Sequence, residues 1–239
     1  MDFNLTDIQQ DFLKLAHDFG EKKLAPTITE RDHKGIYDKD LIDELLSLGI
    51  TGAYFEEKYG GSGDDGGDVL SYILAVEELA KYDAGVAITL SATVSLCANP
   101  IWQFGTEAQK EKFLVPLVEG TKLGAFGLTE PNAGTDASGQ QTVAVKNDDG
   151  TYTLNGSKIF ITNGGAADIY IIFAMTDKSK GNHGITASSS KTACLASLSV
   201  RKKTRWASIL RRPWNSYSRT SKFRLKTCSA KKAKASRSL

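Results

Sequence analysis

The first third of the chain repeats hydrophobic residues at intervals of three and four, which is the spacing of amphipathic helices. A first helix is predicted between Thr6 and Pro26, because Thr6 and Gln9 form a capping box and a proline cannot continue a helix. Its apolar positions are Ile8, Phe12, Leu15, Ala16 and Phe19. A second helix is predicted around residues 41–46 and ends at Gly49.

Residues 69–102 are apolar on nearly all sides, which is typical of helices buried in a bundle. Thr106 then caps a short helix over residues 107–120, with acidic residues in the first turn where the helix dipole favours them. The sequence therefore predicts an N-terminal helical domain over residues 1–120.

The pattern changes to strand-like alternation after Leu123. Val143 and Val145 alternate with polar residues, and "NDDG" at 147–150 predicts a hairpin turn. Asn155-Gly156 is a second turn signal, of type I′, and residues 168–174 are rich in β-forming residues. We predict an incomplete antiparallel β-domain over residues 121–187, because only about four strands precede residue 185, too few for a closed or two-layered sheet.

The charge distribution divides the chain near residue 186. Residues 1–185 hold all 28 Asp and Glu and 15 of the 30 Lys and Arg, while residues 186–239 hold the other 15 and no acid. All 22 glycines lie at or before Gly184. One folded protein rarely changes composition so abruptly, so residues 188–239 form a separate basic segment.

Cysteines and histidines are few and dispersed, with no CxxC motif. This spacing argues against disulfides and against a zinc or histidine metal site, and it favours reduced thiols in a cytoplasmic protein. No apolar run reaches the roughly 18–20 residues that cross a bilayer, and the N-terminus has no signal-peptide pattern.

The segment "FGLTEPNAGTDASG" at 126–139 places small residues and hydroxyls after a short apolar strand. Pro131 favours an extended Glu130, and Gly134 permits close approach of the backbone to a ligand. The segment is neither a P-loop nor a GxGxxG fingerprint, so it fits a diphosphate-binding loop or an ordinary turn. The glycine-rich stretch 56–68 has the same two interpretations, a ligand cradle or a simple connection.

A second stretch, "GSKIFITNGGAAD" at 156–168, again places an aromatic residue and a threonine at a strand end. With this stretch the chain resembles the acyl-CoA dehydrogenase family, most of all its short-chain members. The segments that carry the resemblance, in the family's order and spacing, are "YGGSG", "VEELAKYDAGVA", "FGTEAQKEKFLVPLVEG", "GLTEPNAGTD" and "LNGSKIFITNG". The resemblance covers residues 1–185 and implies an α+β fold, a helical bundle followed by the first strands of an antiparallel β-domain.

The resemblance also implies that the two loops bind FAD. The cofactor-binding positions are Phe126, Gly127, Leu128, Thr129, Gly134, Thr135, Phe160, Ile161 and Thr162. Thr129 would reach the pyrimidine edge of the flavin, Thr162 its N5 atom, and Phe160 one face of the ring, while Thr135 would lie near the pyrophosphate and contact the substrate. The alternatives are plain core packing for Phe160 and strand-end capping for the two threonines.

The implied reaction is α,β-dehydrogenation of a short acyl-CoA such as butyryl-CoA, with electrons passed from FAD to an electron-transferring flavoprotein. In this family the glutamate that removes the α-proton belongs to a C-terminal helical bundle, which also supports a tetramer. The sequence after residue 186 does not resemble that bundle. We therefore assign no catalytic residue to this chain and expect it to be inactive and without the family's support for a homotetramer.

The basic segment 188–239 has two interpretations. In the first it is a disordered tail of a non-enzymatic protein that binds nucleic acid or anionic surfaces, with Trp206 and Trp214 able to stack on bases. In the second it is an out-of-frame translation. Family members are rich in glycine and glutamate here, and GGC and GAA codons read one nucleotide later give the alanines and lysines of Ala230–Ala235. We favour the second, and so expect no specific nucleic-acid partner and no membrane partner.

The out-of-frame interpretation predicts the coding DNA. Read in the neighbouring frame, codons 180–240 will encode a family-like sequence rich in glycine and glutamate, and DNA sequencing checks this. A neighbouring frame without such a sequence would contradict the interpretation.

Overall fold

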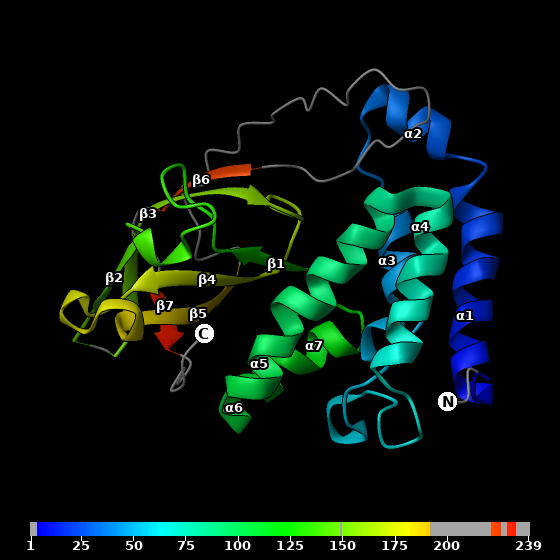
Figure 1. The fold of residues 1–239 in the computed structure, drawn as a ribbon, viewed down its shortest axis with the longest axis horizontal. Coiled ribbons are helices and arrows are strands. Elements are labelled where there is room, and N and C mark those ends of the chain that lie inside the picture. Colours follow the sequence, from blue (N-terminus) through cyan, green and yellow to red (C-terminus); the bar gives the residue numbers. More distant parts are fainter. Residues whose placement is uncertain (1–3, 149, 192–220, 226–228, 233–239) are drawn as a thin grey trace. The chain divides into compact units, whose positions relative to one another are not determined.

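The computed structural model describes residues 4–148, 150–191, 221–225 and 229–232. They group into two compact units (Figure 1). The first contains residues up to Val94 together with Val115–Thr121, and the second contains Ser95–Leu114 and the strands from Lys122 onward. The helices are α1 (Asp7–Phe19), α2 (Ile28–Lys34), α3 (Lys39–Leu46), α4 (Val69–Ser91), α5 (Asn99–Phe104), α6 (Glu107–Gln109) and α7 (Val115–Val118).

Helix α1 begins with the predicted capping box, in which Thr6 and Gln9 bond each other's backbone N–H groups through their side chains. The chain stays helical through a wider turn, Gly20–Leu24, and leaves the helix before Pro26, as predicted. Gly20 allows α1 to approach α4, because a Cβ there would lie 2.2 Å from the ring of Tyr82. The next helix, α2, was not predicted from the sequence.

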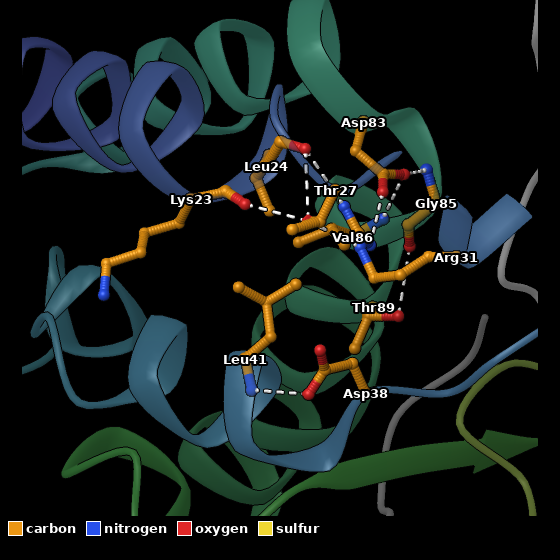
Figure 2. A network of polar contacts seen from close by, with 10 residues as sticks. All are labelled: Lys23, Leu24, Thr27, Arg31, Asp38, Leu41, Asp83, Gly85, Val86 and Thr89. Atoms are coloured by element: carbon orange, nitrogen blue, oxygen red, sulfur yellow. Dashed lines mark hydrogen bonds and ion pairs between the residues drawn. The ribbon is translucent and has the colours of Figure 1, made fainter. Parts of the chain in front are cut away.

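Helix α4 is interrupted at Asp83, whose backbone is extended (φ −150°, ψ 97°). One oxygen of its carboxylate accepts hydrogen bonds from the amides of Gly85 at 2.9 Å and Val86 at 3.1 Å. The carboxylate therefore caps the second half of the helix. Its other oxygen accepts a 2.8 Å bond from Arg31, which reaches it from α2 (Figure 2).

Arg31 and Asp83 are 4% and 2% exposed, so the ion pair is buried. Arg31 also donates to the hydroxyl of Thr27 at 3.0 Å and to the carbonyl of Leu24 at 3.4 Å (Figure 2). A buried pair is tolerated when its remaining donors and acceptors are also satisfied. The ion pair thus connects α2 to the point where α4 is interrupted.

The helical path Val69–Phe104 contains an 18-residue window with a mean hydropathy of 1.5, and 61% of that window is buried. By length and composition this path would allow a membrane crossing, so the sequence-based statement that no apolar run is long enough was wrong. Its burial matches the other prediction made for this stretch, namely helices packed inside a bundle.

The second unit is built on a mixed sheet. The strands are β1 (Gly124–Gly127), β2 (Val143–Lys146), β3 (Tyr152–Ile161), β4 (Ile169–Met175), β5 (Ile185–Lys191), β6 (Ser221–Leu225) and β7 (Ser229–Lys232). Among these strands the order is β1-β4-β2-β3-β7-β5, with β6 on β3 and an additional pairing of β5 with β4. β1 runs parallel to β4, whereas β2–β3 and β4–β5 are antiparallel.

Four strands precede residue 185, as predicted, and the pairings close a ring from β4 through β2, β3, β7 and β5 back to β4. The ring closes only through β5 and β7. Strands β6 and β7 fall in the segment for which the sequence predicted no structure. Most of that segment lies outside the described residues.

The turn between β2 and β3 forms at 147–150 as predicted, closed by a 2.8 Å bond from the amide of Asn147 to the carbonyl of Thr151. The type I′ turn predicted at Asn155-Gly156 was wrong, because β3 runs straight through both residues. The pairing with β2 ends at Asn155, and the pairing with β6 begins at Gly156. A Cβ there would lie 2.2 Å from Thr142 Oγ1, so this glycine serves close packing rather than a turn.

Strand β5 places two hydroxyls against the apolar strand β4. Ser188 is paired with Ile172 and Ser189 with Ile171, and both serines are buried. Neither hydroxyl has a hydrogen-bond partner in the part of the chain that the structure describes. A buried hydroxyl without a hydrogen-bond partner costs about 1–3 kcal/mol. From Ser188 onward the sequence of β5 is therefore unfavourable for a strand that is buried against β4.

Replacing Asp83 tests the buried pair of the helical unit. Asp83→Ala leaves Arg31 without its charge partner and removes a helix cap, so we expect a loss of about 3–5 kcal/mol in the free energy of unfolding, measured by urea denaturation. The matched control is Asp43→Ala, which breaks the exposed pair with Lys39 and should cost less than about 1 kcal/mol. Equal losses in the two variants would contradict this account.

Candidate functional site

The ends of β1 and β3 lie side by side. The amide of Ile159 donates a 2.8 Å hydrogen bond to the carbonyl of Thr129, two residues after β1 ends. Gly127, the last residue of β1, faces Lys158 and Ile161, since a Cβ there would lie 3.6 Å from a side-chain carbon of each. The two stretches singled out in the sequence therefore form one site.

Strand β3 contains a bulge at Phe160. Its backbone is left-handed (φ +57°), which is unusual for a residue other than glycine, and the pairing with β6 shifts register between Lys158 and Ile161. Tyr152, Leu154 and Lys158 point inward at every second position, but after the bulge Ile161 points inward instead of Phe160. Bulges re-aim side chains in this way. As a result the Phe160 side chain is 50% exposed beside the loop.

A buried ammonium group lies under the loop that follows β1. Lys158 is 0% exposed, and its Nζ donates to the Leu128 carbonyl at 2.8 Å, to Glu130 Oε1 at 2.8 Å and to Gln140 Oε1 at 3.2 Å. Three acceptors around one nitrogen require three N–H groups, so the lysine is charged.

The carboxylate of Glu130 completes this network and is 4% exposed. It accepts hydrogen bonds from the amides of Gln141 at 2.6 Å and Thr142 at 2.9 Å in addition to the bond from Lys158. Burial raises the pKa of this carboxyl, but the hydrogen bonds outweigh it, so the pKa lies below the ordinary value. Burial lowers the pKa of Lys158, which Glu130 opposes.

A second link joins the end of β3 to the start of β1. Asn163 has a left-handed backbone (φ +63°) and is buried, and its side-chain amide donates a 2.8 Å bond to the carbonyl of Gly124. Asparagine tolerates this conformation better than most residues. The stretch 158–163 is therefore fastened to β1 at both of that strand's ends.

Several donors at this site make no hydrogen bond within the described residues. They are the half-buried hydroxyls of Thr129 and Thr162 and the exposed backbone amides of Gly134 and Thr135. The Cβ position of Gly134 is open, with no atom within 4 Å. Hydroxyls and backbone amides are the donors that bind a polar ring edge or a diphosphate without a lysine. The residues present thus fit such a ligand.

Two domain descriptions match this chain. Residues 6–121 match the acyl-CoA dehydrogenase N-terminal domain, and residues 125–208 match the acyl-CoA dehydrogenase middle domain. The chain belongs to the acyl-CoA dehydrogenase family. The resemblance found in the sequence is thereby confirmed.

Relatives in this family include the short-chain specific acyl-CoA dehydrogenase of Megasphaera elsdenii, which is 97% identical over 187 residues, covering 78% of this chain and 49% of that protein. The protein of the same description from Clostridium acetobutylicum is 51% identical over 187 residues, covering 78% and 48%. The chain thus spans about half the length of these curated relatives.

Solved structures confirm the fold class. The butyryl-CoA dehydrogenase of M. elsdenii superposes with a TM-score of 0.90 at 80% identity, covering 96% of this chain and 58% of that one. A chain in the structure of the electron transferring flavoprotein of Acidaminococcus fermentans gives 0.88 at 52% identity, covering 97% and 58%. A glutaryl-CoA dehydrogenase of Mycobacterium smegmatis in complex with FADH2 gives 0.81 at 29% identity, covering 95% and 54%.

The nine predicted cofactor-binding positions of this acyl-CoA dehydrogenase chain are not equally exposed. Phe126 packs edge-to-face on Phe173, with ring centroids 5.2 Å apart, and remains partly exposed. Ile161 is fully buried, side chain and backbone alike. Gly134 and Thr135 lie on the exposed outer part of the loop 131–139.

Sequence reasoning missed Lys158, Gln140 and Asn163. A signal for Lys158 was present, because its place in the alternation of β3 points it inward, and an inward lysine needs a carboxylate partner. Glu130 was considered only for the extended backbone that Pro131 imposes on it. For Gln140 and Asn163 no sequence pattern indicates the partner, since both bond to backbone or side-chain atoms distant in the sequence.

The glycine-rich stretch 56–68 is a connection and not a cradle. Its amides are used internally: Ser62 donates to Gly52 at 2.9 Å, Gly63 to Phe55 at 2.8 Å and Gly67 to Ser62 at 2.9 Å. Within the described ranges, no group of three His, Cys, Asp or Glu residues is placed to hold a metal ion. Trp206 and Trp214, named for the tail, lie outside the described residues.

The pH dependence of stability tests the Glu130 carboxylate. Because its folded-state pKa is depressed, its stabilising contribution is present above the ordinary value of 4.5 and is lost as the pH falls through the folded-state pKa. Glu130→Gln strands a buried lysine, so it should lower the free energy of unfolding by about 3–5 kcal/mol at neutral pH. This deficit should shrink below pH 4.5, measured by urea denaturation across pH.

The control for this measurement is the exposed Glu111→Gln, which should stay within about 0.5 kcal/mol of the unmodified chain at every pH. A Glu130→Gln deficit that does not change with pH would show that the carboxylate is not the titrating group.

Proposed function

We propose that this chain carries the FAD-binding part of a short-chain acyl-CoA dehydrogenase. The observation behind the proposal is the bond from the Ile159 amide to the Thr129 carbonyl, which aligns two strand ends whose hydroxyl donors are unused. Support comes from the 97% identical relative and from relatives solved as an FAD complex and an FADH2 complex, each at 29% identity.

The proposal gives each residue a role that its position allows. The hydroxyls of Thr129 and Thr162 donate to the edge of the flavin ring, and the exposed ring of Phe160 covers one face. The amides of Gly134 and Thr135 bind the diphosphate, and Thr135 also contacts the substrate. FAD supplies the hydride acceptor when it is bound. Fixed donors at the ring edge favour the reduced, partly anionic ring.

For the whole protein we propose a short acyl-CoA such as butyryl-CoA as substrate and an electron-transferring flavoprotein as electron acceptor. The butyryl-CoA dehydrogenase of M. elsdenii and the chain in the A. fermentans flavoprotein structure support this assignment. We assign no proton-abstracting base among the described residues.

We further propose that residues 188–239 are an out-of-frame translation of the same gene. The match to M. elsdenii covers 187 residues, 78% of this chain. Ser188 and Ser189 are also the first buried residues of β5 with unpartnered hydroxyls among the described residues. A sequence selected for this strand would place apolar side chains against β4.

Flavin retention tests the cofactor assignment. The purified chain, dialysed against FAD, should show the visible absorbance of oxidised flavin. Thr129→Val and Thr162→Val should each weaken FAD binding about 5- to 30-fold, because each removes one hydrogen bond to the ring. Fluorescence titration with FAD measures the change.

The matched control is Thr121→Val, an exposed threonine outside both loops, which should leave FAD affinity unchanged. A chain that stays colourless and does not bind added FAD would overturn the proposed function.

A further inference from the structure

Lys158 uses all three of its donors to join segments that are far apart in the sequence. The carbonyl of Leu128 and the side chains of Glu130 and Gln140 surround its Nζ at 2.8, 2.8 and 3.2 Å. Leu128 and Glu130 lie at one end of the loop 131–139, and Gln140 lies at the other end. The ammonium group therefore closes the base of this loop.

Glu130 strengthens the same closure from the opposite side. It accepts the amides of Gln141 and Thr142, just beyond the far end of the loop, at 2.6 and 2.9 Å. Its own backbone pairs with Ala133 across a tight turn, with N···O distances of 3.0 and 3.3 Å. One ion pair and the backbone bonds to its carboxylate thus join the two ends of the stretch 128–142.

The same lysine fixes the other proposed flavin-binding segment. Lys158 immediately precedes Ile159, whose amide bonds to Thr129, and the bulge at Phe160 follows. If Lys158 Nζ moved away from the Leu128 carbonyl, Thr129 and Ile159 would no longer be held in register. Phe160 would likewise no longer be held in position beside the loop. One buried side chain thus positions both groups of donors.

We propose that Lys158, together with Glu130 and Gln140, is a positioning residue for the flavin site: it holds the loop 128–142 and the bulge at Phe160 in one arrangement. The proposal rests on the proposed function and extends it to residues that face no ligand. An apolar side chain would fill the same space at lower desolvation cost but would leave the Leu128 carbonyl and Glu130 unpaired. The lysine therefore serves to restrict the loop to one specific conformation.

The test uses the full chain carrying Lys158→Met, which keeps the apolar stem and removes the charge. Hydrogen exchange of the unliganded protein should accelerate about tenfold or more at the amides of Gln141, Thr142 and Ile159, because their acceptors are no longer held. FAD should bind about tenfold or more weakly, and the visible spectrum of any bound flavin should shift, because its surroundings change.

Two controls separate positioning from stability. Lys122→Met breaks the exposed pair with Asp168 in the same unit, at 3.3 Å, and should leave hydrogen exchange in the loop and FAD affinity unchanged. Asp83→Ala destabilises the helical unit through its own buried pair and should leave the affinity of the folded protein for FAD unchanged.

The outcomes are distinct. If the unmodified chain does not bind FAD, the proposed function fails and this inference fails with it. If the unmodified chain binds FAD and Lys158→Met binds it equally well, or if loop exchange is unchanged, only the positioning role is wrong. Equal losses of affinity in Lys158→Met and Asp83→Ala would show that Lys158 contributes to stability alone, which also overturns the inference.

Discussion

The buried ion pair of Lys158 and Glu130 is the interaction on which the candidate site depends. Two charges taken out of water are costly, and their mutual attraction offsets that cost only when every remaining donor and acceptor is satisfied. Here the lysine has three acceptors and the carboxylate receives three hydrogen bonds. The pair lies under a loop of small residues that has little apolar surface to bury. Such a loop cannot fix its conformation by hydrophobic packing, so polar bonds at its base do so instead.

The helical unit uses the same chemistry for a similar purpose. Arg31 and Asp83 are buried where α4 departs from helical geometry, and the carboxylate bonds the amides that the interruption leaves open. In both units, then, a buried carboxylate accepts backbone amides and is neutralised by a long basic side chain. Both pairs occur where the backbone is irregular and hydrogen bonds within helices or strands are missing. This placement follows from the rule that buried backbone N–H groups must find acceptors.

Local signals in the sequence predicted the regular parts of the fold. The capping box at Thr6, the helix cap at Thr106 and the turn at 147–150 are confirmed, because each depends on residues close together in the sequence. The failures have a common cause. Gly156 was interpreted as a turn residue, although its role is set by Thr142 across the sheet. For the candidate site, the two loops were predicted from motifs, but Lys158 and the bulge were not. Lys158 depends on partners 18 to 30 residues away, and the bulge is a shift in the pairing with β6, which lies still further along the chain.

The bulge in β3 has a consequence for how the site can change. Because Phe160 is turned out of the regular alternation, it is half exposed, and Ile161 fills the inward position in its place. The bulk of the residue at 160 is therefore less constrained by core packing than the bulk at 161. A larger or smaller aromatic ring can therefore replace Phe160 without rearranging strand β3. Substitutions at this one position can change the ring that lies beside the loop while the rest of the strand stays the same.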